Sequence, residues 1–243
     1  MNRLIIENLS AGYGAVSVLH QVSIEVSEGE FVALLGTNGN GKSTLLNCIM
    51  GFIKPTSGRI VFEQDGHALD LTALPPHEIV RRGLSMVPEG RRLVPSLSVE
   101  DNLKLAGSNP VVRDRLNENL AYCYRTFPLL LERKTQLAGT MSGGQQQLLA
   151  IARSLMTVPK IVVVDEPSVG LAPIVVSQVI EAIRTLQRES NLTILMAEQS
   201  FLQTIDVASR AYILAHGRIA RHFDRNAGTI DQEEIRRALL GAG

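Results

Sequence analysis

A short glycine-rich stretch decides the fold: Gly36-Thr37-Asn38-Gly39-Asn40-Gly41-Lys42-Ser43-Thr44. It has the G-x-x-x-x-G-K-S/T spacing of a phosphate-binding loop. The apolar run 31–35 before it predicts a buried strand, and residues 43–50 after it predict a helix. This strand-loop-helix setting is the one that the motif requires. A glycine-rich turn that happens to carry a lysine is the alternative, but it leaves both flanks unexplained.

The composition of this loop suits phosphate binding. Its three glycines let the backbone turn tightly, so that successive N–H groups point at a phosphate, and the positive end of the following helix adds to the attraction. Lys42 can neutralise the outer phosphates, and the Ser43 hydroxyl can complete the coordination of Mg²⁺. We therefore expect a nucleotide with Mg²⁺ at this loop.

Length, composition and charge narrow the class of protein. The chain has 243 residues, 45% of them hydrophobic, and a formal net charge of zero. These values fit one domain with an ample core, and a chain without a basic stripe is not expected to bind nucleic acid. No apolar stretch approaches the roughly 18 residues that span a bilayer, and residues 1–4 carry no signal-peptide pattern, which predicts a cytosolic protein.

Strand and helix patterns alternate along the chain, which predicts an α/β fold. Strands are expected at 4–8, 22–26, 31–35, 59–63, 84–87, 161–164, 193–197 and 211–214. The strands before the phosphate loop are predicted to pair antiparallel, and the continuously β-branched run 161–164 to lie in a buried parallel sheet. Helices are expected at 99–107, 112–127 and 145–156, with no strand between about 89 and 157. Residues 89–157 are thus predicted to be a helical insertion into a core formed by 1–88 and 158–243.

Two adjacent carboxylates follow the run 161–164. Asp165 and Glu166 would lie at the carboxyl edge of the sheet, where open α/β sheets bind ligands. In phosphoryl-transfer sites one carboxylate holds Mg²⁺ and another can activate the attacking water. The alternative is an acidic pair near the start of a helix, stabilised by the helix dipole.

A third motif introduces the helix predicted at 145–156. Ser142 and Gln145 have the spacing of a capping box, which by itself would explain them. Gly143 and Gly144, however, lower helix propensity by about 1 kcal/mol each. They also expose main-chain N–H groups at a helix start, where anions bind.

Together these motifs resemble the ATP-binding subunits of ABC transporters over essentially the whole chain. The phosphate loop, Ser142-Gly143-Gly144-Gln145, the run 161–167 and Tyr13-Gly14 come in the order of that family. The stretches 87–92, 139–144, 165–173 and 197–200 are similar to one of the two ATPase subunits of branched-chain amino-acid importers. The resemblance implies a P-loop NTPase (RecA-like) fold with a mixed sheet, an N-terminal antiparallel β subdomain and a helical subdomain.

The resemblance also implies a role for each motif. Tyr13 would stack on adenine, residues 36–44 would wrap the phosphates of ATP, Asp165 would support Mg²⁺, and Glu166 would be the general base. Ser142 to Gln145 would instead close over ATP held by a second ATP-binding subunit, either a sister ATPase or another copy of this chain.

Three residues depart from the general family pattern but suit the branched-chain subgroup. Glu89 replaces a glutamine; its carboxylate could bind Mg²⁺, and it adds a charge that Arg91 or Arg92 would have to offset. Gln199 replaces the switch histidine and can hydrogen-bond a γ-phosphate oxygen without carrying a proton. Ala172 replaces an aspartate that reaches across the dimer.

By the same resemblance, the chain would be peripheral at the cytoplasmic face of the membrane. Its partners would be two permease subunits, docked near 89–97, and indirectly an external solute-binding protein. Residues 231–240 are predicted to form a short amphipathic helix packed on the body. Other cargoes such as urea or amides, an ABC ATPase outside transport, and a subunit that uses ATP only to hold the dimer together remain alternatives.

Overall fold

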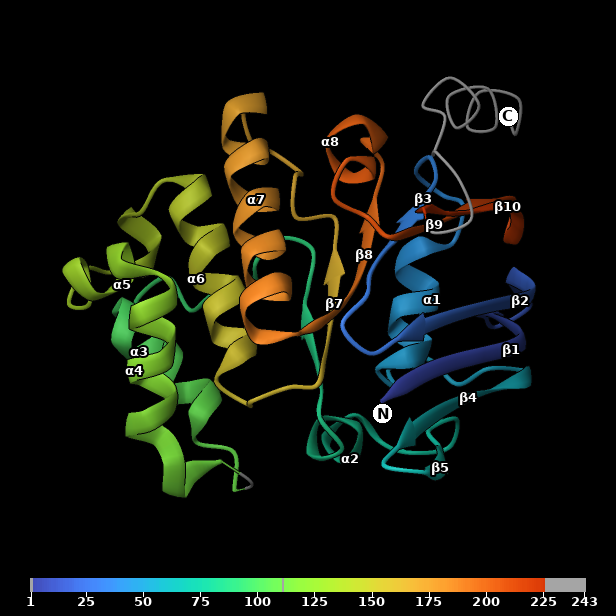
Figure 1. The fold of residues 1–243 in the computed structure, drawn as a ribbon, viewed down its shortest axis with the longest axis horizontal. Coiled ribbons are helices and arrows are strands. Elements are labelled where there is room, and N and C mark those ends of the chain that lie inside the picture. Colours follow the sequence, from blue (N-terminus) through green and yellow to red (C-terminus); the bar gives the residue numbers. More distant parts are fainter. Residues whose placement is uncertain (1, 111, 226–243) are drawn as a thin grey trace.

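The computed structural model describes residues 2–110 and 112–225, which form two sheets flanked by helices (Figure 1). The larger sheet has the strand order β10-β9-β3-β8-β7-β6, and all its pairs are parallel except β9 with β10. Its strands are β3 (Phe31–Leu35), β6 (Leu84–Val87), β7 (Ile161–Asp165), β8 (Thr193–Glu198), β9 (Arg210–Ala215) and β10 (Arg218–Asp224). The parallel strands end at one edge, and the phosphate loop, Glu89, Glu166 and Gln199 follow the ends of β3, β6, β7 and β8.

The smaller sheet is antiparallel throughout, with the order β2-β1-β4-β5. Its strands are β1 (Arg3–Tyr13), β2 (Val16–Ser27), β4 (Ser57–Gln64) and β5 (His67–Asp70). The predicted antiparallel pairing of the strands near the N-terminus is confirmed for β1 and β2. The strands β5 and β10 were not predicted, because most of their residues are exposed and polar and carry no apolar alternation.

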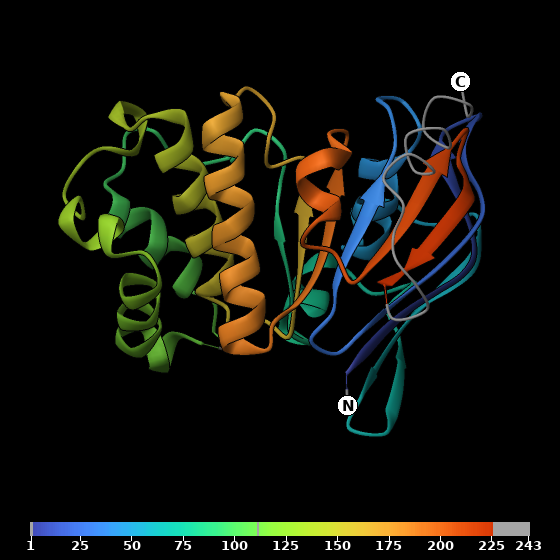
Figure 2. The same ribbon diagram turned by 45° about the horizontal axis from the view of Figure 1, so that its top comes forward.

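The core lies on both faces of the larger sheet, and β3 shows how the sequence divides it. Phe31, Ala33 and Leu35 face one apolar cluster, which contains the helices of the insertion and the long helix α7 (Pro173–Ser190). Val32 and Leu34 face a second cluster, which contains the helix α1 (Lys42–Ile49) and the inner residues of β1 and β2. A strand buried on both faces is continuously apolar, as this one is. Figure 2 shows α1 behind β3 and α7 on the other side.

Among the described residues between β6 and β7 the regular elements are helices, apart from an isolated bridge between Ser98 and Leu137. They are α3 (Val99–Gly107), α4 (Leu116–Thr126), α5 (Pro128–Glu132) and α6 (Gly143–Leu155), with 3-10 turns at Arg113–Arg115 and Ala138–Thr140. In Figure 1 this block stands apart from the antiparallel sheet, with α7 between it and the strands. The exact boundaries proposed for it, 89 and 157, stay a prediction.

One helix prediction needs correction. The helix predicted at 112–127 starts as a 3-10 turn and ends at Thr126, because Pro128 disfavours the helical conformation at Phe127 (φ −127°, ψ 78°). The helices α5, α7, α2 (Pro76–Arg81) and α8 (Phe201–Ile205) were not predicted. The predicted helix at 231–240 lies outside the described residues. No helix in the described ranges has the length and apolar character needed to cross a membrane.

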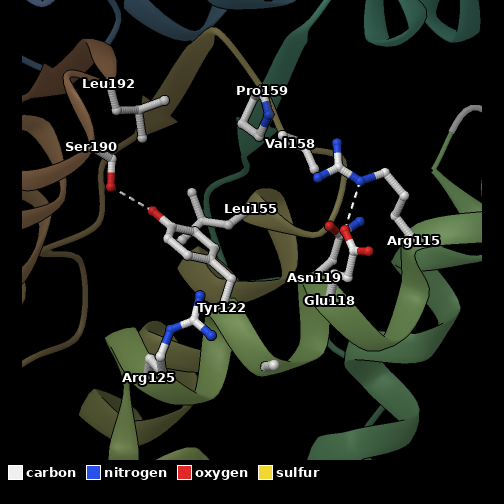
Figure 3. Close-up of a pocket in the computed structure, with 11 residues that line it drawn as sticks. Arg115, Glu118, Asn119, Tyr122, Arg125, Leu155, Val158, Pro159, Ser190 and Leu192 are labelled. Atoms are coloured by element: carbon white, nitrogen blue, oxygen red, sulfur yellow. Dashed lines mark hydrogen bonds and ion pairs between the residues drawn. The ribbon is translucent and has the colours of Figure 1, made fainter.

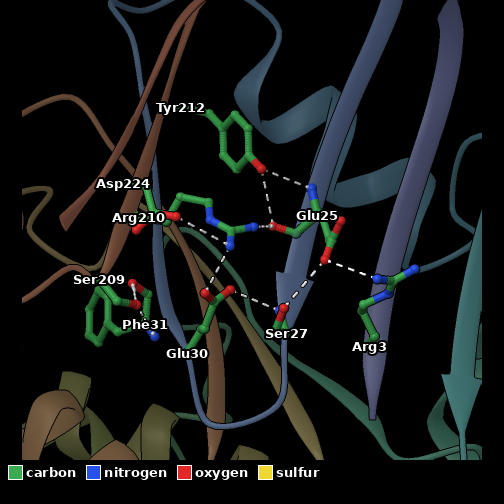
Figure 4. Close-up of polar contacts among 9 residues, drawn as sticks. All are labelled: Arg3, Glu25, Ser27, Glu30, Phe31, Ser209, Arg210, Tyr212 and Asp224. Atoms are coloured by element: carbon green, nitrogen blue, oxygen red, sulfur yellow. Dashed lines mark hydrogen bonds and ion pairs between the residues drawn. The ribbon is translucent and has the colours of Figure 1, made fainter. Parts of the chain in front are cut away.

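A polar network joins the smaller sheet to the larger sheet through β2 and β9 (Figure 4). Arg210 on β9 forms an ion pair with Glu30 (3.1 Å), and its guanidinium also donates to the main-chain oxygen of Glu25 on β2 (3.4 Å). The Tyr212 hydroxyl lies 3.2 Å from the Glu25 nitrogen and donates to the Glu25 oxygen (3.3 Å). The network therefore fixes β2 against β9 through residues 185 positions apart in the sequence.

We expect Arg210→Met to lower the free energy of unfolding by about 2 kcal/mol, because it leaves the largely buried Glu30 without its cation. The matched control is Arg115→Met, which removes an exposed ion pair with Glu118 and should cost less than about 0.5 kcal/mol. Urea unfolding of the two variants measures both values. Equal losses would show that the Arg210 pair contributes no more than a surface pair.

Candidate functional site

The phosphate loop connects β3 to α1, and its three glycines are required for two different reasons. Gly39 and Gly41 have φ of 84° and 99°, in the region that favours glycine. Gly36 has an ordinary φ, but a Cβ there would lie 2.4 Å from the main-chain oxygen of Leu214. The loop is thus pressed against β9 at its start and turned left-handed before the helix.

Lys42 is buried at the start of α1 and is held by three oxygens. Its Nζ donates to the main-chain oxygens of Gly36 (2.8 Å) and Thr37 (3.3 Å). It also forms an ion pair with Glu166 Oε1 at 2.9 Å, in which the lysine is 3% and the glutamate 9% exposed. The loop lysine and the predicted general base therefore neutralise each other in this structure.

The carboxylate pair lies where the sequence predicted it, at the carboxyl end of β7. Ser43 Oγ donates to Asp165 Oδ1 at 3.1 Å. Burial raises the pKa of Asp165 to about 6, and the charges of Glu166 and Glu89 act in the same direction, while the Ser43 hydrogen bond and Lys42 oppose them. A bound cation would favour the ionised form. Glu166 itself has a φ of 43°, an uncommon conformation for glutamate.

A cavity of about 460 Å³ opens above these residues. It is lined by Tyr13, Val18, Asn38, Gly39, Gly41, Lys42, Ser43, Thr44, Glu89 and Glu166. Tyr13 is 55% exposed, and its hydroxyl lies 3.5 Å from Thr44 Oγ1. The structure thus brings together the predicted adenine contact, the phosphate loop, the predicted base and Glu89. Val18 was not predicted.

Glu89 lies in a loop whose arginines bind the helical block and not the Glu89 carboxylate. Arg91 donates to the side chains of Gln147 (3.3 Å) and Gln146 (3.2 Å), and Arg92 donates to the main-chain oxygen of Glu89 (3.4 Å). Within the described ranges neither arginine forms an ion pair with the Glu89 carboxylate, so the expected charge compensation is not present. Arg153 on α6 donates to the main-chain oxygens of both arginines, and this contact was not predicted.

The capping box at the start of α6 is confirmed: Ser142 accepts from the Gln145 nitrogen (3.4 Å), and the Gln145 side chain accepts from the Ser142 nitrogen (3.0 Å). The two glycines also have a packing reason, since a Cβ on Gly144 would lie 2.4 Å from Val175 on α7. Ser142 to Gln145 are not among the residues that line the phosphate cavity. The same chain therefore does not close its own site with this motif in this structure.

Gln199 and Ala172 are both exposed, and neither lines the phosphate cavity. Gln199 follows β8, and its main-chain nitrogen donates to the Glu198 carboxylate (3.2 Å). Ala172 is the residue before α7. Sequence reasoning assigned no role to Glu198 or to its partner Ser168, because these residues are 30 positions apart and their contact depends on the fold.

A second cavity, of about 620 Å³, lies at the other end of β7 and β8 and contains none of the predicted site residues (Figure 3). It separates α4 from the segment 158–159 and from the end of α7. The hydroxyls of Tyr122 and Ser190 lie 2.6 Å apart and join α4 to α7 across it. This contact is one of the points at which the helical block is attached to the core.

The fold and the loop geometry define a P-loop nucleotide-binding protein. The family described as ABC transporter matches residues 19–169. The chain belongs to the ABC transporter family. The predicted family, the P-loop NTPase fold and the ATPase class are thereby confirmed, and ATP binding is general for this domain.

Two similar proteins cover nearly the full chain. The high-affinity branched-chain amino acid transport ATP-binding protein BraG of Pseudomonas aeruginosa is 43% identical over 98% of this chain and 99% of that protein. The probable branched-chain amino acid transport ATP-binding protein LivF of Archaeoglobus fulgidus is 32% identical over 96% of each. A solved nucleotide-free ATP-binding cassette from an ABC transporter has a TM-score of 0.84 at 28% identity and covers 99% of this chain and 96% of that one.

Proposed function

We propose that this chain hydrolyses ATP to power an importer of branched-chain amino acids or a related small solute. One observation carries the ATPase part: Lys42, Ser43, Asp165 and Glu166 meet at the phosphate loop beside a cavity of about 460 Å³. The similarity to BraG and LivF, whose names state branched-chain amino acid transport, supports the cargo. A non-hydrolysing subunit would not need a buried glutamate at this position.

The residues around the loop suit the proposed reaction. The phosphates of ATP would replace Glu166 as partners of Lys42, and the main-chain N–H groups of the loop would hold them. The freed Glu166 carboxylate would accept a proton from the attacking water. Tyr13 would stack on adenine, a contact that its exposed ring can make. The Gln199 amide would hydrogen-bond a γ-phosphate oxygen.

The acidic and hydroxyl oxygens near the loop fit Mg²⁺. Ser43 and Asp165 are already hydrogen-bonded to each other, and Glu89 lines the same cavity. Among the described residues, no three histidine, cysteine or acidic side chains form a ready-made metal cluster. That agrees with Mg²⁺, which is held by one or two carboxylates together with substrate phosphates. When bound, the ion would neutralise charge on the phosphates.

A partner subunit would complete the site. Val169 and Ile174 lie on either side of Ala172 in the sequence and are 48% and 69% exposed, so both large apolar side chains are accessible for a contact. We propose that they contact a second ATP-binding subunit in a head-to-tail dimer, whose ATP would meet Ser142 to Gln145. The partner is either a sister ATPase or another copy of this chain.

The permease contact is proposed at the loop that follows β6. A small cavity of about 110 Å³ lies there, between the loop and the helical block, lined by Gly90, Arg91, Leu93, Pro95, Ala138, Gly139 and Gln146. Through Arg91 and Arg153 this loop is tied to α6 and thus to Ser142 to Gln145 at the start of that helix. The chain would then be peripheral at the cytoplasmic face of the membrane, held by two permeases.

A pull-down from native membranes tests this proposal. Tagged chain is recovered in mild detergent at physiological salt, with membranes from untagged cells as the control. Two permeases, a sister ATPase and a solute-binding protein are the expected partners, and the ligand of that binding protein reveals whether the cargo is a branched-chain amino acid, urea or an amide. Recovery of ribosomes or repair factors would contradict transport and leave the ATPase proposal standing.

We expect Gln199→His to retain ATP hydrolysis, because imidazole also donates a hydrogen bond to a γ-phosphate oxygen. Gln199 is exposed, so the larger ring meets no packed neighbour at this position. The control is Gln199→Leu, which has a similar size and no donor and should lower turnover. Phosphate release at saturating Mg-ATP measures both variants. Complete loss of hydrolysis in Gln199→His would show that this site is built differently.

A further inference from the structure

Glu198, the last residue of β8, is 0% exposed and carries three hydrogen bonds on its carboxylate. The Ser168 main-chain nitrogen donates to Oε1 at 3.0 Å, and the Ser168 hydroxyl donates to Oε2 at 2.8 Å. The Gln199 nitrogen also donates to Oε2, at 3.2 Å. Both carboxylate oxygens are therefore used, and all three donors belong to loops at the carboxyl edge of the sheet.

These bonds join the parts of the site that face the γ-phosphate. Ser168 lies in the loop between Glu166 and Ala172, so it links the proposed base to the proposed subunit contact. The main-chain oxygen of Glu198 accepts from the Gly36 nitrogen at 3.4 Å, at the start of the phosphate loop. In addition, the Glu166 nitrogen donates to the main-chain oxygen of Ala197 at 3.0 Å. The end of β8 thus contacts three loops at once.

The burial of this carboxylate is unfavourable for the fold alone. Removing a charge from water costs several kcal/mol in effective terms, and an apolar side chain at this position would avoid that cost. The described residues offer Glu198 no ion pair with a cation. Burial raises its pKa, and the hydrogen bonds from Ser168 and Gln199 lower it only in part. A carboxylate at this costly position is explained if it fixes the geometry of the loops that are bonded to it.

We propose that Glu198 is a positioning residue for ATP hydrolysis, which holds the loop of Glu166 and the segment of Gln199 in one fixed arrangement. This inference rests on the roles proposed above for Glu166 and Gln199. The two loops come from different strands, and the Glu198 side chain is bonded to both of them. Movement of either loop must therefore break a hydrogen bond to a buried carboxylate.

A glutamine cannot replace this carboxylate, because three donors need two acceptor atoms. The amide of glutamine has one acceptor oxygen, and its NH₂ group is a donor. If the oxygen accepts from the Ser168 nitrogen, the Gln199 nitrogen loses its partner. If the oxygen accepts from Gln199, the NH₂ group faces the Ser168 N–H. Either arrangement releases one of the two loops while the size of the side chain stays the same.

We expect Glu198→Gln to lower kcat roughly ten- to a hundredfold, the range produced by a misplacement of about 1 Å in an active site. The Kd for ATP should change less than about threefold, since Lys42 and the phosphate loop are untouched. Ser168→Ala keeps its main-chain bond to Glu198 and should show a smaller loss. The matched control is Thr193→Val at the opposite end of β8, where a buried hydroxyl accepts from the Gly29 nitrogen (2.9 Å) and should not affect kcat.

The measurements are phosphate release, binding of a fluorescent ATP analogue, and thermal unfolding. A kcat loss in Glu198→Gln with unchanged ATP binding and unfolding temperature is the expected result. An unchanged kcat, or losses of kcat, ATP binding and stability together in both Glu198→Gln and Ser168→Ala, would overturn the positioning role. Glu166→Gln is measured in parallel and separates the two proposals. If turnover persists in Glu166→Gln, Glu166 is not the general base. If turnover is lost in Glu166→Gln but not in Glu198→Gln, only the positioning role of Glu198 is contradicted.

Discussion

Replacing Glu166 with glutamine is expected to lower Mg-ATP turnover roughly 10²- to 10⁴-fold, the contribution of a positioned general base, while ATP binding stays intact. The glutamate is nearly buried beside Lys42, and its carboxylate would be the proton acceptor for the attacking water. An amide has the same shape but cannot accept that proton. Phosphate release gives the turnover, and titration with a fluorescent ATP analogue gives the binding.

The control for this variant is Glu181→Gln. Glu181 lies on α7 in an exposed ion pair with Arg184 (3.5 Å), so the same chemical change there should leave both turnover and binding unaltered. If turnover in Glu166→Gln equals that of the unchanged protein, Glu166 is not the base. If ATP binding falls together with turnover, the glutamate contributes to the nucleotide site itself and not to the chemical step.

The ion pair between Lys42 and Glu166 explains why binding should survive. In this structure the lysine is bonded to Glu166 and to two main-chain oxygens of its own loop. Phosphates must compete with that carboxylate for the lysine. Glutamine is a weaker competitor because it carries no charge, so Lys42 would be more available to ATP in the variant. The same exchange would free the carboxylate for water only when ATP is in place.

The local motifs could be predicted from the sequence because their chemistry is contained in a few adjacent residues. The phosphate loop has glycines where the backbone is left-handed or pressed against β9, and the helix at Val99–Gly107 has the predicted bounds. The capping box of Ser142 and Gln145 is also a local pattern. In each case the residues that determine the structure are at most a few positions apart.

The long helix α7 shows where local patterns mislead. It starts with Pro173-Ile174-Val175-Val176, and β-branched residues favour strands when read alone. Its buried residues Val176, Val179, Ile180 and Ile183 recur with helical spacing, a signal that was present in the sequence and was not used. Tertiary packing on the larger sheet then favours the helix over the strand for this segment.

Side-chain contacts between distant positions outside the motifs were not predicted. Glu198 is hydrogen-bonded to Ser168 only because β7 and β8 pair in parallel and end at the same edge. Arg210 contacts Glu30, from which it is separated by most of the chain. Arg91 could as well have paired with Glu89, the nearest carboxylate in sequence, but its guanidinium instead bonds Gln146 and Gln147 on α6. Which partner a side chain bonds thus depends on distances that exist only in the folded chain.

Replacing Lys42 with alanine is expected to abolish tight nucleotide binding, with an affinity loss of roughly a hundredfold or more. Charge-assisted hydrogen bonds contribute up to about 3 kcal/mol, and each 1.4 kcal/mol is a tenfold change. The variant also leaves Glu166 without its cation at the point where phosphates would bind, so repulsion adds to the loss. Titration with a fluorescent ATP analogue measures the affinity, and Lys54→Ala, at an exposed lysine bonded to the Leu74 oxygen, is the control.

The unpaired Glu166 makes a second variant necessary, because a buried charge can disturb the fold as well as the site. In the double variant Lys42→Ala/Glu166→Gln the buried charge is removed together with its partner, which is far less costly than removing the lysine alone. We expect thermal unfolding of the double variant to return close to that of the unchanged protein while ATP binding stays weak. Recovery of tight binding in the double variant would mean that the loop backbone holds the phosphates without the lysine. The weak binding of the single variant would then be an effect of the orphaned carboxylate.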